Sequence, residues 1–135
     1  MPKPTLTAPP APKPSEPIVQ LLDEWQNRLR LQDWDITVEY LPYQRVEAFG
    51  LARTNLSQRV SIIELVPQDQ LQHETLVDDI EVTLVHELLH VKSADALETA
   101  SGATKPEIDG PLWECFVEHV AQALVAAKRG QQRVR

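Results

Sequence analysis

Cysteine and long apolar runs are the first things this chain lacks. Its 135 residues contain one cysteine, Cys115, so no disulfide can form within the chain. That fits a reducing compartment. No apolar run approaches the roughly 20 residues that a membrane-spanning helix needs, and the opening Met1-Pro2-Lys3-Pro4 lacks the apolar segment of a secretory signal. We therefore expect a cytoplasmic protein with no membrane partner.

Aromatic residues and positive charge are also scarce. Aromatic side chains make up 5% of the chain, so a core must consist mainly of Leu, Val, Ile and Ala. The formal net charge is -7, which argues against nucleic acid as the main partner, because such binding needs a concentrated basic surface. The basic residues near the C-terminus favour a solvated helix end that complements the helix dipole; they are Lys128, Arg129, Arg133 and Arg135.

Proline is concentrated at the N-terminus. Residues 1–16 hold Pro2, Pro4, Pro9, Pro10, Pro12 and Pro14. Proline fixes φ and removes backbone donors, so this leader is predicted to be disordered or polyproline-like. It is also a candidate recruitment element for a proline-recognising partner.

The first half of the remaining chain predicts one helix and three strands. Apolar residues recur at helical spacing over residues 15–32, with Ser15 and Pro17 suited to the helix start. Apolar and polar residues then alternate with the period of a half-buried strand, and the three strands are expected at residues 34–41, 48–55 and 59–66. Short links between them predict an antiparallel three-stranded sheet.

The second half predicts two helices. A helical pattern covers residues 75–93, a polar loop is expected over 94–109, and a final helix over 111–129 ends at Gly130. The expected organisation is one α+β domain at residues 17–130, followed by a tail at 131–135. One domain is what a chain of this length supports.

The segment from His86 to His90 contains the pattern His-Glu-x-x-His. On a helix, residues four apart lie on one face, so both imidazoles can point at the same ion. Zinc favours such nitrogen and oxygen ligands. Glu87 lies one step around the helix, where it can act as the general base for a water activated by the metal.

The flanks of this motif strengthen the metal interpretation. Residues on most sides of the helix are apolar, so three titratable side chains there are costly unless something pairs them. The flanking residues are Val82, Leu84, Val85, Leu88, Leu89 and Val91. The alternative is an amphipathic helix whose histidines bind no metal. A metal ion explains better why three titratable side chains lie among apolar residues.

A third protein ligand is expected, because catalytic zinc usually has three ligands and a water. Glu114 and Glu118 lie four apart in the final helix and therefore share a face. One of the pair can bind the metal while the other orients a ligand histidine. The spacing alone does not decide which does which.

His86-Glu87-x-x-His90, followed 24 residues later by Glu114 on a helix, resembles the gluzincin clan of zinc metallopeptidases, and most closely its minimal single-domain phage and bacterial members. The resemblance covers about residues 18–127 and implies a zincin-like fold. It implies that His86, His90 and Glu114 bind Zn²⁺, that Glu87 is catalytic, and that Glu118 hydrogen-bonds the first motif histidine. It also implies a substrate peptide extended along an exposed strand, for which residues 59–66 are the candidate edge.

The chain departs from the gluzincin pattern in one respect that matters for catalysis. Gluzincins often use a downstream tyrosine or histidine to stabilise the oxyanion, and both tyrosines of this chain precede the motif. His119 lies about 140° around the helix from Glu114 and is expected to point elsewhere. Cys115 is expected to be a small buried side chain rather than a fourth ligand, and His73 a surface residue.

These observations predict a zinc-dependent metallopeptidase, an endopeptidase rather than an exopeptidase, acting on a peptide or protein substrate. The alternative is a non-catalytic or latent zinc-binding module, in which the site is structural or is plugged by the leader or the basic C-terminus. Four protein ligands would indicate the structural site, and three ligands with an open position would indicate the enzyme.

Overall fold

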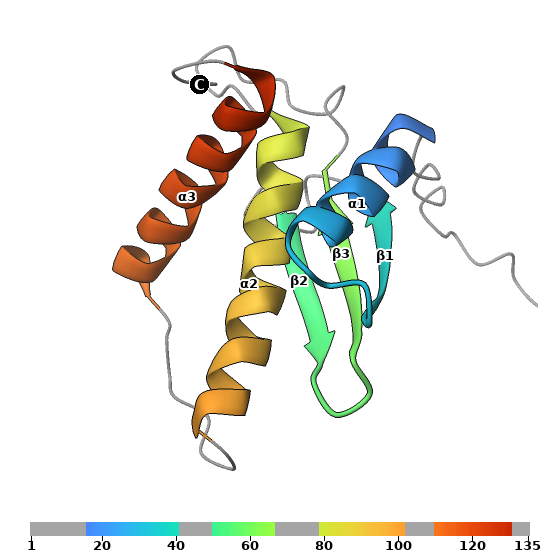
Figure 1. The fold of residues 1–135 in the computed structure, drawn as a ribbon, viewed down its shortest axis with the longest axis vertical. Coiled ribbons are helices and arrows are strands. Elements are labelled where there is room, and N and C mark those ends of the chain that lie inside the picture. The colour runs from blue at the N-terminus through green and yellow to red at the C-terminus, as the bar shows by residue number, and fades with distance from the viewer. Residues whose placement is uncertain (1–15, 41–49, 67–78, 102–109, 131–135) are drawn as a thin grey trace, which may run out of the picture.

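The computed structural model describes residues 16–40, 50–66, 79–101 and 110–130. Three helices and three strands lie within these ranges, which makes the chain an α+β protein (Figure 1). In chain order the elements are α1 (Glu16–Arg28), β1 (Asp35–Tyr40), β2 (Gly50–Asn55), β3 (Val60–Leu65), α2 (Ile80–Ser101) and α3 (Pro111–Arg129). The leader up to residue 15, His73 and the tail at 131–135 lie outside the described residues.

The sheet is mixed, so the expectation of an antiparallel sheet was wrong. The strand order is β1-β3-β2; β2 runs antiparallel to β3, but β1 runs parallel to it, with Asp35 opposite Val60 and Tyr40 opposite Leu65. The short link expected between β2 and β3 is confirmed, since residues 56–59 form a turn between them. The link from Tyr40 to Gly50 is longer than the two to five residues of a hairpin loop, and β1 pairs with β3 rather than with β2, its successor in the chain.

This strand order corrects a second expectation. The strand at residues 59–66 was the candidate edge for a substrate peptide, but β3 is the central strand and pairs on both sides. Its backbone donors and acceptors are therefore already used within the sheet. Among the described strands, β1 and β2 form the edges.

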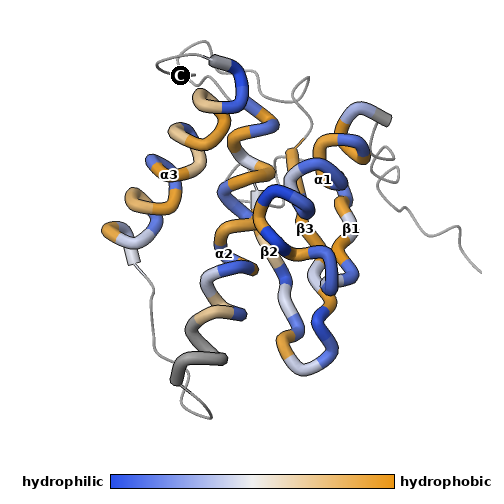
Figure 2. The backbone as a smooth tube through the Cα atoms, viewed as in Figure 1, coloured by the Kyte–Doolittle hydropathy of each residue, from blue (hydrophilic) through white to orange (hydrophobic). Residues whose placement is uncertain are grey.

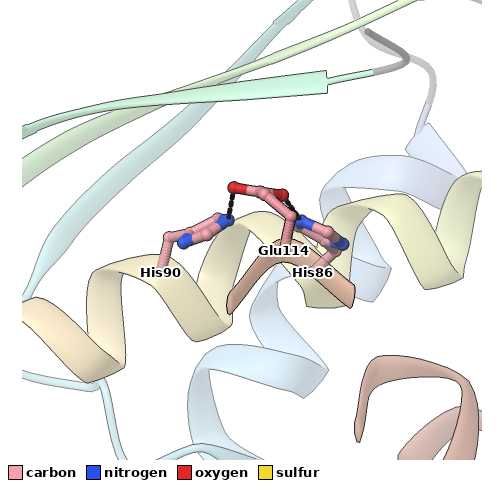
Figure 3. Close-up of side chains that lie close together, drawn as sticks. All are labelled: His86, His90 and Glu114. Carbon is pink, nitrogen blue, oxygen red and sulfur yellow. Dashed lines mark hydrogen bonds and ion pairs between the residues drawn. The ribbon is translucent and has the colours of Figure 1, made fainter. Parts of the chain in front are cut away.

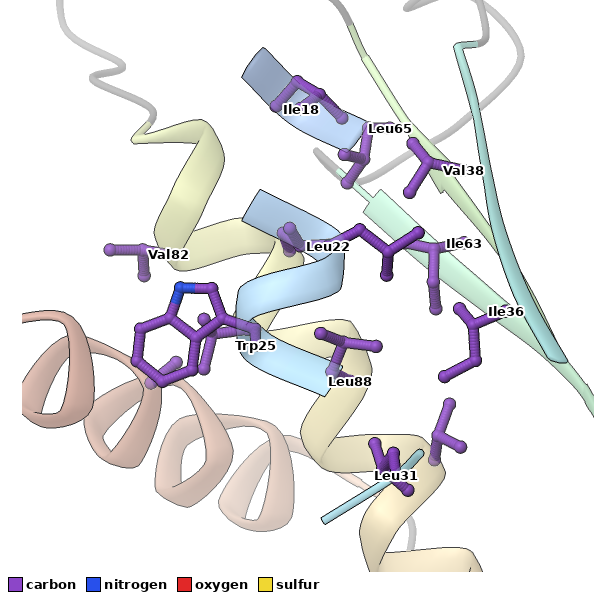
Figure 4. Packing of buried hydrophobic residues seen from close by; sticks show 14 of the residues in the cluster. Ile18, Leu22, Trp25, Leu31, Ile36, Val38, Ile63, Leu65, Val82 and Leu88 are labelled. Carbon is purple, nitrogen blue, oxygen red and sulfur yellow. The ribbon is translucent and has the colours of Figure 1, made fainter. Parts of the chain in front are cut away.

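The core lies between the sheet and the helices (Figure 4). Alternate residues of β1 and β3 point into it, among them Ile36, Val38, Ile63 and Leu65, as their period-2 pattern predicts. Helix α1 adds Ile18, Leu22 and Trp25 at helical spacing. Figure 1 shows α1 and α3 on either side of α2, and Figure 2 shows hydrophobic residues on successive turns of α3. Within the described residues, no helix is both long and apolar enough to cross a membrane.

Two helix boundaries differ from those predicted. Helix α1 ends at Arg28 rather than near residue 32, because Arg30 adopts a positive φ of 59° and Gln26 donates to the backbone oxygens of Leu31 and Trp34. Helix α2 continues to Ser101 through the region expected to be a loop. Residues 94–101 contain neither glycine nor proline, and three of them are alanine, the best helix former.

A glycine lets α2 lie close to the sheet. A Cβ placed on Gly50 would come within 2.8 Å of the Thr83 methyl group and 3.3 Å of the backbone oxygen of Glu64. Thr83 lies one turn before Glu87 on α2. Because Gly50 has no side chain, α2, which carries the motif, can lie close to β2 at this point.

Candidate metal centre

Helix α2 presents the two motif histidines toward α3. Its first turn is capped by Asp79, whose carboxylate accepts hydrogen bonds from the backbone amides of Glu81 and Val82. His86 and His90 follow one turn apart, with ring centroids separated by 5.0 Å. Both are partly buried, with side chains 13% and 24% exposed. Neither side chain is therefore completely shielded from solvent.

Helix α3 brings a carboxylate to both histidines at once. One oxygen of Glu114 lies 2.8 Å from Nε2 of His86, and the other lies 3.0 Å from Nε2 of His90 (Figure 3). Ligand atoms of these three residues all lie within 4.8 Å of one another. Two imidazole nitrogens and a carboxylate therefore converge on one point, and no other such group of three is found among the described residues.

Glu118 contacts the opposite side of the His86 ring. Its Oε1 lies 3.0 Å from Nδ1 of His86, and its Oε2 accepts a hydrogen bond of 2.8 Å from Gln122. A carboxylate on Nδ1 fixes the ring orientation and leaves Nε2 directed at Glu114. Glu114 therefore lies beside both Nε2 atoms, and Glu118 lies on the Nδ1 side of His86.

Gln122 was missed by the sequence analysis, although a signal for it exists. It lies four residues after Glu118, which in turn lies four after Glu114. Residues four apart on a helix share a face, so the same argument that paired the glutamates extends to Gln122. Its amide holds Glu118 in place while Glu118 holds His86.

Acidic side chains surround His86. Burial lowers the pKa of His86, but the hydrogen bond to Glu118, the charge of Glu87 and the contact with Glu114 outweigh it, so the pKa is raised overall. The carboxyl groups of Glu87, Glu114 and Glu118 all act on this one imidazole. A divalent cation between the Nε2 atoms and Glu114 would be attracted to these acidic groups, and the donor set suits zinc.

Glu87 is a buried acid in this setting. It is 7% exposed, and the described residues give its carboxylate no hydrogen bond. Burial raises its pKa to about 7; His86 lowers it, whereas Glu114 and Glu118 raise it further. A buried carboxylate without a hydrogen bond from the described part of the chain is unusual, and it fits a group that completes its contacts with a bound ligand or water.

The neighbours of Glu114 on α3 do not join the cluster. Cys115 is exposed, so the prediction of a buried side chain was wrong. Its Sγ lies 3.9 Å from Nε2 of His119, which is exposed as well. His119 therefore points away from the candidate site, as its helical angle predicts.

The basic residues Lys128 and Arg129 lie in the last turn of α3, as expected for a helix end, and Arg129 is exposed. Their ion pairs were not expected: both bind the buried carboxylate of Glu81, and Arg129 binds Asp79 as well. Nothing in the sequence around Glu81 indicates that its partners lie at the C-terminal end of α3.

No family model matches the chain, and neither the curated proteins nor the solved structures contain a significant match. Support for a metallopeptidase therefore comes from the residues and geometry of this chain.

Proposed function

We propose that this protein is a zinc-dependent metallopeptidase of the gluzincin type, with a zincin-like fold and a Zn²⁺ ion held by His86, His90 and Glu114. The observation that carries the proposal is the single carboxylate of Glu114 spanning Nε2 of both motif histidines. Three donors of these types, brought from two helices to one point, form the ligand set of a catalytic zinc site with an open position.

A zinc ion at this position supplies Lewis-acid activation of a water molecule and of a substrate carbonyl. Glu87 acts as the general base: its buried carboxylate accepts the proton of the attacking water and later delivers it to the leaving amine. A pKa of about 7 in the metal-free protein falls when positive charge is bound nearby, which keeps the carboxylate ionised for proton acceptance. Glu118 holds the His86 ring through Nδ1.

Openness of the site favours an enzyme over a structural zinc module. A structural site closes around the ion with four protein ligands. Only three donors converge among the described residues, and the side chain of Glu114 is 55% exposed. An exposed ligand leaves room for a water and for a peptide substrate.

Metal content and hydrolysis together test the proposal. We expect about one zinc per chain by elemental analysis, lost in Glu114→Ala, and retained in Glu87→Gln and in the control His119→Ala, which removes an exposed histidine of the same helix. Cleavage of an unfolded protein such as casein should be lost in Glu87→Gln and kept in His119→Ala. Absence of stoichiometric zinc from the wild type would refute the metal site, and equal zinc with equal cleavage in Glu87→Gln would refute the assigned base.

A further inference from the structure

One side of α3 is apolar although it faces solvent. Leu112 is 88% exposed and Phe116 is 56% exposed, and the ring of Trp113 stacks on that of Phe116 with centroids 5.4 Å apart. Both exposed residues lie about 160° around the helix from Glu114. Because Glu114 contacts His86 on α2, they point away from α2. In Figure 1, α3 lies against α2 at one side of the molecule, and no other described helix or strand lies beyond it.

This side of α3 also lacks charge over about four turns. Between Leu112 and Ala127 the only charged residues are Glu114 and Glu118, and both contact His86 on the opposite side of the helix. A helix face in solvent normally carries charged and polar residues, so an uncharged apolar one marks an interaction surface. Its residues, four exposed and two half-buried, form what we call the outer face: Leu112, Trp113, Phe116, Val120, Ala123 and Ala127.

Five residues of the outer face have the spacing of a coiled-coil seam. They recur at intervals of three, four, three and four, and are Trp113, Phe116, Val120, Ala123 and Ala127. These are the a and d positions through which two helices pack side by side. The residues of α3 that are buried in the fold are different ones: Val117, Ala121, Val125 and Ala126. Helix α3 therefore has two apolar stripes, and α2 covers only one of them.

The order of side-chain sizes along the outer face indicates its partner. The bulky Trp113 and Phe116 come first, and the small Ala123 and Ala127 come last. We propose that a second copy of this chain packs its own α3 antiparallel on the outer face and forms a two-fold symmetric dimer. Trp113 then lies opposite Ala123 of the second copy, and Phe116 lies opposite Val120 of the second copy. Each bulky side chain thus meets a smaller one, and the symmetry axis repeats each contact.

Charge and area both agree with a second copy as the occupant. Each chain has a formal net charge of -7, so two copies repel each other unless they meet through an uncharged surface. The outer face exposes roughly 500 Å² per copy, near the upper end of the largest apolar patches on monomers. Burying it on both copies removes about 1,000 Å² from water, which reaches the lower limit for a specific interface. The dimer is therefore a weak one, with a dissociation constant in the micromolar range.

The dimer leaves both candidate metal centres open. Glu114 and Glu118 face α2, on the side of α3 away from the second copy. The dimer therefore does not depend on the proposed function, and zinc affinity should be the same in monomer and dimer.

Sedimentation velocity measures the dimer. Reducing buffer is needed, because Cys115 is exposed and could cross-link two copies. The wild type should change from monomer to dimer as its concentration rises from about 1 to about 200 μM. Phe116→Glu should weaken the dimer at least about thirtyfold, since a buried aromatic side chain is typical of the residues that dominate binding, and the symmetric interface loses it twice.

A matched control separates this surface from exposed apolar residues in general. Val19 on α1 is 47% exposed, so Val19→Glu makes the same kind of change outside the outer face and should dimerise as the wild type does. Circular dichroism should show both variants folded. Equal dimerisation of Phe116→Glu and the wild type would overturn the proposal, and so would an equal loss in Val19→Glu.

Mixing two variants tests the antiparallel arrangement. Because residue 116 lies opposite residue 120 of the second copy, Phe116→Glu and Val120→Lys should each be monomeric alone and form a mixed dimer when combined. A parallel pair would bring neither charge opposite the other, so the absence of a mixed dimer would refute the antiparallel packing. A wild type that stays monomeric over the whole concentration range would overturn the dimer and leave the outer face to a different protein or to the proline-rich leader.

Discussion

Replacing Glu87 with glutamine should stabilise the metal-free protein at neutral and alkaline pH. The pKa of Glu87 is about 7 in the folded chain, against an ordinary value of 4.5, chiefly because the carboxyl is buried. The folded state therefore holds a proton that the unfolded state has released. A raised acid pKa contributes stability that is fully present below pH 4.5 and is lost as pH rises through about 7.

The size of the effect follows from the pKa. The interval from 4.5 to about 7 corresponds to about 3 kcal/mol, since one pKa unit is roughly 1.4 kcal/mol. Glutamine keeps the shape of the acid and cannot ionise. The free energy of unfolding of Glu87→Gln should thus match the wild type near pH 4.5 and exceed it by about 3 kcal/mol at pH 8.

Urea denaturation in EDTA at several pH values between 4.5 and 8 measures this difference. His86 also loses stabilisation as pH rises, because its pKa is raised, but it is present in both proteins, so the comparison isolates Glu87 and its interaction with His86. Saturating zinc should shrink the difference, because the nearby cation favours the ionised carboxylate. A difference that stays constant over the pH range would refute a buried, unbonded Glu87.

Three further predictions concern the scaffold of the site. Gly50→Ala should destabilise the fold by about 1–3 kcal/mol in urea titrations, since its Cβ would meet Thr83 at 2.8 Å; an unchanged midpoint would show that α2 can move away from β2. Leu88→Ala, at a fully buried position between the motif histidines, should cost about 2–5 kcal/mol, checked by thermal unfolding, and a loss below 1 kcal/mol would contradict its packing. Burial raises the pKa of Glu81, but its hydrogen bonds to Lys128, Trp25 and Arg129 outweigh this and lower it; the wild type should therefore lose stability as pH falls below about 4.5, and Glu81→Gln should lose less.

Local sequence patterns were sufficient to predict the helices and strands around the motif. The strand alternation, the helix of His86 and His90, and the end of α3 at Gly130 all depend on neighbours in sequence, and the structure has each of them. The pairing of β1 with β3 was missed, because alternation reveals which residues are buried and not which strand lies alongside. The same limit hid the partners of Lys128 and Arg129, since Glu81 lies more than 45 residues earlier in the chain.

The candidate site depends on local spacing within each helix and on contacts between residues distant in sequence. Spacing within α2 places His86 beside His90, and spacing within α3 places Glu114 beside Glu118, but neither spacing sets one helix against the other. That relation is made by contacts distant in sequence: the short apolar residues of α3, and Glu81 at the far end of the helix pair. The ion pairs of Glu81 with Lys128 and Arg129 join the start of α2 to the end of α3, and Val125 is fully buried one turn earlier on α3. The contacts that bring Glu114 to His86 and His90 therefore lie far from these three residues in the sequence, which is why spacing within each helix could not place them.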